Sequence, residues 1–273
     1  MQAEPSAPEA AESAAPERRR DRQRRELTAE IIAIARRQLA DGGRAGVSWR
    51  AIAREVGMNP ASLYTYFASL DELFTAVIID TYAGLADALD EALAGATDNR
   101  ATAGAADNRA TAGATDNRAT AGGTLGDRRV GSAVRPDPVP LVAVVRAYRR
   151  WALDHPAHYN LIFTDQIPGY AAPPGGPTVD AEVAMLRPLI AAFGLAIGQI
   201  ASVDEPDRAP PGAVAQMVAT WGALHGLVAL EINNHLPFID EREDLLVDAV
   251  LRAVGRDRGP VGPELLGDRE TPD

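Results

Sequence analysis

Apolar residues recur every three or four positions along most of this chain, which is the spacing of an α-helix. Near the N-terminus, Leu27, Ile31, Ile34 and Leu39 approximate one helical face, and DGG at residues 41–43 predicts the end of that helix. No stretch shows the strict alternation that is typical of a β-strand. The pattern therefore predicts an all-α fold.

Capping residues divide the next part of the chain into closely spaced helices. Ser48 is a good N-cap for a helix that ends at Gly57, and Asn59 followed by Pro60 marks the start of another. The sequence SLDE at residues 69–72 is a capping box, which predicts a further helix. We expect that helix to turn one apolar face toward a core: Leu73, Val77, Leu85 and Leu89.

Three copies of a nine-residue unit interrupt the helical pattern. ATDNRATAG, AADNRATAG and ATDNRATAG stand in tandem at residues 96–104, 105–113 and 114–122. Such a period can indicate a parallel β-helix, but these units contain no Val, Ile, Leu or aromatic residue to bury. We therefore expect a flexible linker at residues 95–139.

Helical spacing returns after Pro140. It predicts one helix to about Asp154 and another from near Pro156. Three further helices are expected over residues 179–200, 212–236 and 241–254.

The net charge of −11 conceals a strongly basic segment. Residues 18–54 contain 11 Arg and four acidic residues, a local net charge of +7, whereas residues 76–273 contain 16 Arg and 27 acidic residues. Every basic residue is Arg. A basic module followed by an acidic body predicts that the module contacts nucleic acid.

Composition also excludes several classes of protein. The chain has no cysteine, which excludes disulfides and thiolate metal sites and suits the cytoplasm. It has no unbroken apolar run of about 18 residues and no signal peptide at its N-terminus. We therefore expect a cytoplasmic protein without a membrane partner.

The stretch Ser48–Phe67 has the layout of a helix-turn-helix, whose second helix enters the DNA major groove. If Leu63 and Phe67 face inward, small side chains remain on the outward face and let the backbone approach base edges. Tyr64 and Tyr66 flank that face and can reach phosphates. The alternative is that both tyrosines only pack a small helical domain; the basic patch favours DNA binding.

This block resembles the N-terminal domain of TetR-family transcriptional regulators, over about residues 24–81. The matching residues are Ser48, Ile52, Ala53, Gly57, Leu63, Tyr64, Tyr66 and Phe67. The resemblance implies a homodimer that reads an operator in double-stranded DNA. It implies phosphate contacts from Ser48, Trp49, Tyr64 and Tyr66. It implies base contacts from Arg50, Pro60, Ala61, Ser62 and Thr65.

Leu70 departs from the family pattern, which often has a phosphate-binding lysine there. Arginines in the stretch ERRRDRQRRE at residues 17–26 could compensate, as a basic arm along the DNA backbone or in the minor groove. The candidates for this arm are Arg18, Arg19, Arg20, Arg22 and Arg24. The alternative is a solvated charge run without a partner.

The region after Pro140 resembles, more loosely, a TetR subgroup with a Trp…His-Gly signature. In the family this region forms the small-molecule pocket and the dimer interface, where the last two helices would build a four-helix bundle with their mates. We assign four residues to the dimer interface: Trp221, Gly222, His225 and Gly226. Trp221 and His225 could instead belong to the core or to the wall of the pocket.

Bulky residues on the other helices are candidates for a pocket that binds a small apolar or aromatic effector, because few charges lie on these faces. They are Tyr82, Trp151, Tyr159, Phe163, Met185, Phe193 and Met217, a set that describes a core equally well. His155 and His158 could share a metal, but Pro156 separates them and only Asp154 could add a carboxylate. We expect no metal and no cofactor.

These interpretations give the domain boundaries. We expect a disordered acidic tail at 1–20, a helix-turn-helix DNA-binding domain at 21–70, a connecting helix at 71–94, the linker at 95–139, an effector-binding and dimerisation domain at 140–255 and a flexible tail at 256–273.

The leading hypothesis is a dimeric repressor that a small molecule releases from its operator. The alternative is a DNA-binding regulator of the same fold without an effector, either constitutive or controlled by a partner. An enzyme is disfavoured, because the chain has no cysteine, no Gly-rich phosphate loop, no Gly-x-Ser-x-Gly motif and only four histidines.

Overall fold

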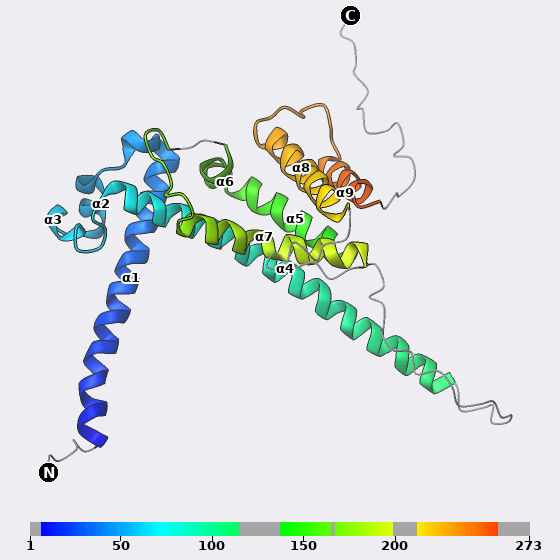
Figure 1. The fold of residues 1–273 in the computed structure, drawn as a ribbon, viewed down its shortest axis with the longest axis horizontal. Coiled ribbons are helices and arrows are strands. Elements are labelled where there is room, and N and C mark those ends of the chain that lie inside the picture. The colour runs from blue at the N-terminus through cyan, green and yellow to red at the C-terminus, as the bar shows by residue number, and fades with distance from the viewer. Residues whose placement is uncertain (1–6, 115–136, 165–166, 199–211, 256–273) are drawn as a thin grey trace, which may run out of the picture. The chain divides into compact units, whose positions relative to one another are not determined.

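The computed structural model describes residues 7–114, 137–164, 167–198 and 212–255, and within these ranges it contains helices and no strand (Figure 1). The all-α prediction is confirmed. The helices are α1 (Ala7–Gly46), α2 (Trp49–Val56), α3 (Pro60–Leu63), α4 (Leu70–Ala114), α5 (Val139–Asp154), α6 (Pro156–Phe163), α7 (Pro177–Ile197), α8 (Ala213–Ile232) and α9 (Arg242–Ala253).

The chain forms two compact units. Unit 1 comprises Met1–Tyr82 and Ala157–Val179, and unit 2 comprises Ala83–Pro156 and Asp180–Asp273. This division differs from the expected boundary, which placed all of residues 140–255 in one domain. Tyr170 shows why the segment after α6 joins unit 1: its ring meets Phe74 of α4 edge-on at 6.3 Å, and its hydroxyl lies 2.8 Å from the Thr75 hydroxyl.

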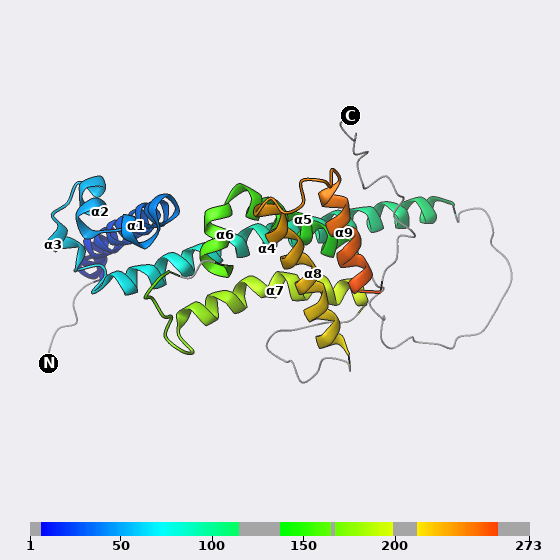
Figure 2. The same ribbon diagram turned by 90° about the horizontal axis from the view of Figure 1, so that it is seen from above.

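The core of unit 1 contains the apolar residues that helical spacing indicated. Ile31, Ile34 and Leu39 of α1 are buried, and Leu27 is partly buried against them. In α2 and α4 the buried side chains include Ile52, Leu73, Phe74 and Val77. Both Figure 1 and Figure 2 show α2 and α3 beside the C-terminal part of α1.

The helix caps are those expected from the sequence. The Ser48 hydroxyl accepts a hydrogen bond from Ala51 N at 3.2 Å, and the Asn59 side chain accepts one from Ala61 N at 2.9 Å. Ser69 accepts from Glu72 N at 3.1 Å, while the Glu72 carboxylate accepts from Ala68 N at 2.6 Å. Each bond satisfies a main-chain donor that a helix leaves without a partner.

Two segments that were expected to lack structure are helical. Residues 7–20 of the predicted acidic tail lie in α1, and residues 95–114 of the predicted linker, with the first two repeats, continue α4. The prediction was wrong for them because a lack of apolar residues excludes a packed core but not the extension of a helix that is already nucleated. Residues 1–6 and 115–136 of these segments, and the predicted tail at 256–273, lie outside the described residues, while Val139 at the end of the predicted linker begins α5.

In unit 2, α8 and α9 pack against each other and against α5. Arg149 of α5 joins them: it donates to both carboxylate oxygens of Glu231 at 2.6 and 2.8 Å and to Glu243 at 3.4 Å. The hydrogen bond to Glu231 raises the pKa of Arg149. Since the Glu231 side chain is only 8% exposed, this pairing keeps its charge compensated.

Helix α8 has an unusually apolar surface. Val214, Val218 and Leu230 are 50%, 59% and 40% exposed. By length and composition, α8 is the one helix in the described ranges that could cross a membrane. The sequence of α8 contains no unbroken apolar run of about 18 residues, because polar residues such as Gln216 interrupt it. A helix that packs in a globular protein passes the same test, and α8 packs against α5 and α9.

Candidate nucleic-acid interface

The turn between α2 and α3 is built as the sequence predicted. Gly57 adopts a left-handed conformation with φ 75°, which favours glycine, and Asn59 and Pro60 start α3. Helix α3 is a single turn that gives way to turns, so it is shorter than the helix expected to reach Phe67. Leu63 and Phe67 are nevertheless 0% and 5% exposed, which confirms the inward face.

The opposite face of α3 and the turn after it presents small side chains to solvent. Ala61 and Thr65 are exposed, while Ser62 and Pro60 are half-buried. The Thr65 hydroxyl donates to the Ser62 carbonyl at 2.7 Å. Without bulky groups at these positions, the backbone can approach base edges in a major groove.

The start of α2 and the end of α3 are brought together by two aromatic rings. The rings of Trp49 and Tyr64 lie 5.3 Å apart, and Tyr64 remains 55% exposed. Ser48, directly before Trp49, accepts the cap hydrogen bond through its hydroxyl oxygen, so its O–H proton stays available to a phosphate. The first turn of α2 carries no acidic residue, and its main-chain N–H groups favour an anion.

Tyr66 has a different environment from Tyr64. It is half-buried and packs against the hydrophobic core of unit 1, and the Arg24 guanidinium lies 5.4 Å from its ring centroid. Arg24 also donates from Nη2 to the main-chain carbonyl of Thr65 at 2.9 Å. The packing interpretation therefore describes part of the role of Tyr66, and the contact from α1 to this turn was not foreseen.

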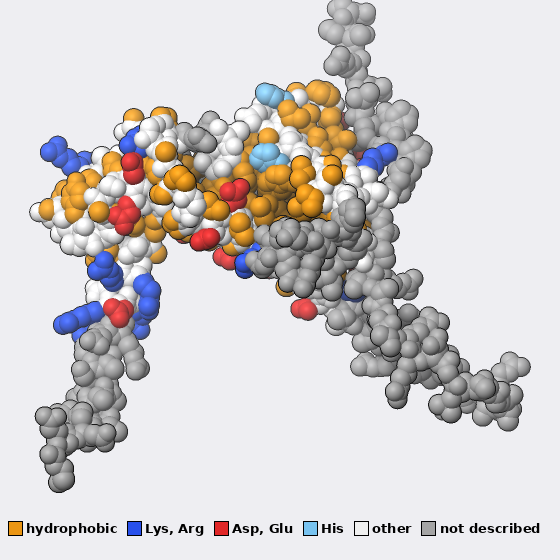
Figure 3. Space-filling view, viewed as in Figure 1, with side chains coloured by type: hydrophobic (Ala, Val, Ile, Leu, Met, Phe, Trp, Pro, Cys, Tyr) orange, Lys and Arg blue, Asp and Glu red, His pale blue; other side chains and the backbone are white. Residues whose placement is uncertain are grey.

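The arginines of the predicted arm lie on a helix. Arg19, Arg20, Arg22 and Arg24 are exposed residues of α1, and the side chain of Arg18 lies outside the described residues. Figure 3 shows basic side chains gathered along this part of α1. This segment is helical because Arg and Glu favour helix and Arg22 pairs with Glu26 one turn later at 3.8 Å. The contact of these arginines with DNA stays a prediction.

Ion pairs divide the basic segment into compensated and uncompensated arginines. Arg36 binds Asp80 at 2.5 Å, Arg44 binds Asp71 at 3.3 Å, and Arg37 pairs with Glu55. Arg50 and Arg54 of α2 are exposed and have no ion-pair partner among the residues that the structure describes. The positive charge that α2 offers to a phosphate therefore lies on Arg50 and Arg54.

The seven pocket candidates are distributed over both units. In unit 1, the ring of Phe163 contacts Tyr82 at 6.2 Å and Tyr159 at 5.0 Å. In unit 2, Met185 is fully buried, and Trp151 stacks on His155 at 5.2 Å in a hollow between α4 and α5. Only Phe193 and Met217 line the apolar cavity described next.

That cavity lies in unit 2 between α5, α7 and α8 and has a volume of about 210 Å³. Aliphatic side chains such as Leu141, Val145 and Leu189 form most of its wall. Thr220 is polar, but its hydroxyl donates to the Gln216 carbonyl at 2.8 Å. Sequence reasoning missed the aliphatic wall because it selected only aromatic residues and Met.

The four predicted interface residues on α8 differ in environment. Trp221 lines the cavity, and its ring meets Tyr148 of α5 at 5.6 Å. His225 stacks on Trp221 and lies 3.0 Å from the Tyr148 hydroxyl through Nδ1, and partial burial lowers its pKa. A Cβ added to Gly222 or Gly226 would meet nothing within 4 Å. Both glycines thus leave room for another helix, and their place in an interface stays a prediction.

Comparisons with known proteins agree with this architecture. Residues 31–77 match the family described as "Bacterial regulatory proteins, tetR family", and residues 141–254 match "Tetracyclin repressor-like, C-terminal domain". The Trp…His-Gly subgroup assignment stays a prediction.

Curated relatives are named as regulators of transcription. The HTH-type transcriptional regulator Rv1816 of Mycobacterium tuberculosis is 29% identical over 238 residues, which cover 79% of this chain and 84% of the relative. The HTH-type transcriptional regulator Mb1846 of Mycobacterium bovis matches equally well.

Two solved structures share the fold. The crystal structure of SCO4313 is 28% identical with a TM-score of 0.57, covering 88% of this chain and 98% of that one. A protein of unknown function from Rhodococcus sp. RHA1 has a TM-score of 0.55 at 19% identity, covering 84% of this chain and 94% of its own.

The helix-turn-helix geometry, the two family matches and the relatives lead to one conclusion. The chain belongs to the TetR family of DNA-binding transcriptional regulators.

Proposed function

We propose that this protein is a dimeric repressor in the cytoplasm and that a small apolar or aromatic molecule releases it from its operator. The observation that carries the proposal is the surface formed where the Trp49 and Tyr64 rings meet. It combines an exposed tyrosine, the capped start of α2 and the uncompensated charge of Arg50.

Phosphate contacts on this surface come from Ser48, Trp49, Tyr64 and Tyr66. Ser48, Trp49 and Tyr64 offer hydroxyl and indole donors at the N-terminus of α2, and Tyr66 adds a hydroxyl from the turn after α3. Such contacts position a protein on the DNA backbone without reading sequence. Base contacts come from the outward face of α3, through Pro60, Ala61, Ser62 and Thr65, and from Arg50. A guanidinium can bind the O6 and N7 atoms of guanine together.

The dimer forms through α8 and α9. A folded monomer rarely exposes a continuous apolar patch without a partner for it, and α8 exposes Val214, Val218 and Leu230. Figure 3 shows hydrophobic side chains over α8. Gly222 and Gly226 leave space for a helix of the second copy to approach, and a two-fold dimer suits an operator with two related half-sites.

The effector enters the cavity of unit 2. Its volume of about 210 Å³ exceeds the cavity of about 150 Å³ that accepts benzene but lies below the range typical of drug-sized ligands. A molecule with a single ring and few polar groups fits these limits. Release follows if the effector binds the DNA-free conformation more tightly than the DNA-bound one.

The alternative function is a regulator of the same fold without an effector. The small volume of the cavity favours it, because a void of this size can also be a packing defect. A screen of single-ring compounds decides between the two: an effector must lower operator affinity, whereas the alternative predicts that no compound does so.

The primary experiment selects bound sequences from a pool of random duplexes with full-length protein at about 150 mM salt. The proposal predicts enrichment of a palindromic motif with half-sites about one helical turn apart. Enrichment of no motif would count against sequence-specific reading by the dimer.

A further inference from the structure

We propose that a cleft between α1 and α6 in unit 1 is a binding site for a small organic acid. The cleft has a volume of about 420 Å³, which lies within the range of small-molecule sites. It is a different site from the apolar cavity of unit 2, and it does not depend on the function proposed above.

The hydrogen-bond donors of the lining indicate an anion. The polar side chains that line the cleft are Arg36, Arg44, His158 and Asn160, and no Asp or Glu is among the lining residues. Each arginine pairs with a carboxylate outside the lining, Arg36 with Asp80 and Arg44 with Asp71. An anion would therefore bind through the N–H donors that these pairs leave open.

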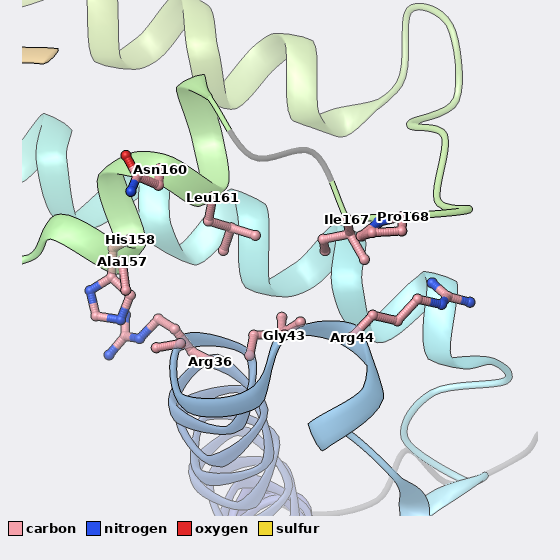
Figure 4. A pocket seen from close by; sticks show the side chains of 11 residues that line it. Arg36, Gly43, Arg44, Ala157, His158, Asn160, Leu161, Ile167 and Pro168 are labelled. Carbon is pink, nitrogen blue, oxygen red and sulfur yellow. The ribbon is translucent and has the colours of Figure 1, made fainter. Parts of the chain in front are cut away.

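The arrangement separates a polar end from an apolar middle. Figure 4 shows Arg36 and His158 at one end of the cleft, Arg44 at the other, and Leu161 and Ile167 between them. Ile167 is 5% exposed and packs in the core of unit 1, so the half-buried Leu161 offers most of the accessible apolar surface of the middle. A ligand that fits this pattern has one carboxylate and a compact hydrocarbon body.

Arg36 is held in place and still has donors to offer. Its Nη1 donates to Asp80 at 2.5 Å, and Asp80 does not line the cleft. A guanidinium carries five N–H donors in a rigid fork, so this one bond leaves others for a bidentate contact with a carboxylate. The side chain is 32% exposed, which keeps it within reach of a ligand.

Arg44 is held less firmly. Its two terminal nitrogens lie 3.3 and 3.4 Å from a single Asp71 oxygen, longer than the 2.7–2.9 Å of strong charged hydrogen bonds. It also lies over the Phe74 ring at 5.0 Å. We therefore place the carboxylate at Arg36, with Arg44 adding attraction from the other end.

The apolar middle makes the hydrocarbon body part of the recognition. A bare inorganic anion would leave the half-buried Leu161 uncovered, whereas a ring or a short alkyl chain would gain from the contact. The neutral amide of the same acid would keep this contact and lose the charged bond to Arg36.

The test measures the melting temperature of full-length protein with sodium benzoate or sodium hexanoate, at constant pH and ionic strength. Benzamide, hexanamide and sodium acetate are the matched controls. We expect at least one of the two acids to raise the melting temperature by about 2–4 °C at several times its Kd, and the controls to raise it much less.

Variants locate the site. Arg36→Gln should abolish the increase, whereas Arg37→Gln, which changes the neighbouring arginine outside the cleft lining, should retain it. Ala157→Phe fills the cleft from an exposed position of α6 and should also abolish it. Met217→Trp fills the cavity of unit 2 and should leave it intact, which separates this site from the proposed effector site.

Three results would overturn the proposal. One is that neither acid stabilises the protein more than its amide does. Another is that the increase survives both Arg36→Gln and Ala157→Phe, and the third is that it disappears in Met217→Trp alone. Each increase is compared with the same variant without ligand, so a change in basal stability does not affect the outcome.

Discussion

Arg24 of α1 donates a hydrogen bond from Nη2 to the main-chain carbonyl of Thr65, 2.9 Å away, and its guanidinium lies over the Tyr66 ring. This contact joins the first helix to the turn that follows α3, 41 residues along the chain. Thr65 and Tyr66 belong to the proposed DNA surface, so Arg24 acts on it as a positioning residue besides any contact of its own with phosphate.

Arg24→Lys keeps the charge and loses the planar fork, and we expect it to weaken operator binding by about 1 kcal/mol, roughly fivefold. The slope of log Kd against log salt should stay unchanged, because the number of phosphate contacts is the same. Arg25→Lys is the matched control and should bind like the parent protein. If Arg24→Lys and the parent bind the operator equally well, Arg24 contributes only its charge and does not position the surface.

Arg50→Ala distinguishes base reading from phosphate binding. If Arg50 contacts a guanine, the substitution should cost about 1–3 kcal/mol and relax the preference at one operator position. Tyr64→Phe removes a phosphate donor and should weaken binding to all sequences alike. Selection from a random duplex pool measures both; a uniform loss for Arg50→Ala would assign it to the backbone.

Val218→Glu places a charge on the exposed apolar face of α8. If this face is the dimer interface, burying an unpaired carboxylate there should shift the protein toward monomer at micromolar concentration. Val179→Glu is the control, because Val179 is also an exposed valine, at 44%, but lies outside α8. Sedimentation equilibrium reads the mass; a Val218→Glu protein that remains dimeric would move the interface elsewhere.

Arg149→Met tests the ion pair that joins α5 to α8 and α9. Removal of Arg149 leaves the Glu231 carboxylate 8% exposed without its main partner, so we expect a loss of about 3 kcal/mol in the free energy of unfolding. The adjacent Arg150→Met is the control, because Arg150 is exposed. Denaturant unfolding measures both variants, and equal effects would mean that the pair contributes little.

Much of unit 1 could be predicted because its signals are local. Ser48, Gly57, Asn59 and Ser69 cap or end helices within four residues of themselves, and their positions in the sequence give the helix-turn-helix directly. The contact of Arg24 with Thr65 could not be predicted, since it depends on where α1 lies beside the turn after α3. Arg24 and Arg25 are both exposed arginines, and no pattern in the sequence distinguishes one from the other.

The residues that line a pocket could not be predicted in this way, because the signals that define a pocket are not local. Trp151 and Met217 both have large apolar side chains, and nothing in the sequence says that they line different hollows of unit 2. A cavity is defined by packing between helices that are distant in the chain, and aliphatic residues such as Leu189 line it as readily as aromatic ones. The prediction for the repeats at 96–113 was wrong for a related reason. Their lack of apolar residues excludes a packed core, but it does not prevent a helix.

His225 makes the stability of unit 2 depend on pH. Burial lowers the pKa of its imidazole from the ordinary 6.5. The unfolded chain therefore takes up a proton as pH falls below 6.5 while the folded protein resists it, so the free energy of unfolding decreases until the folded-state pKa is passed. Above pH 6.5 both states are neutral and the effect vanishes.

His225→Gln removes this titration, while its side chain can still bond to the Tyr148 hydroxyl. We expect the loss of stability between pH 7 and about pH 5 to be smaller in His225→Gln than in the parent protein, because one group no longer binds a proton preferentially in the unfolded state. His235→Gln, an exposed histidine after α8, is the control and should keep the parent's pH dependence. Denaturant unfolding across this range measures the three proteins, and parallel curves for the parent and His225→Gln would show that the imidazole takes up its proton equally in both states.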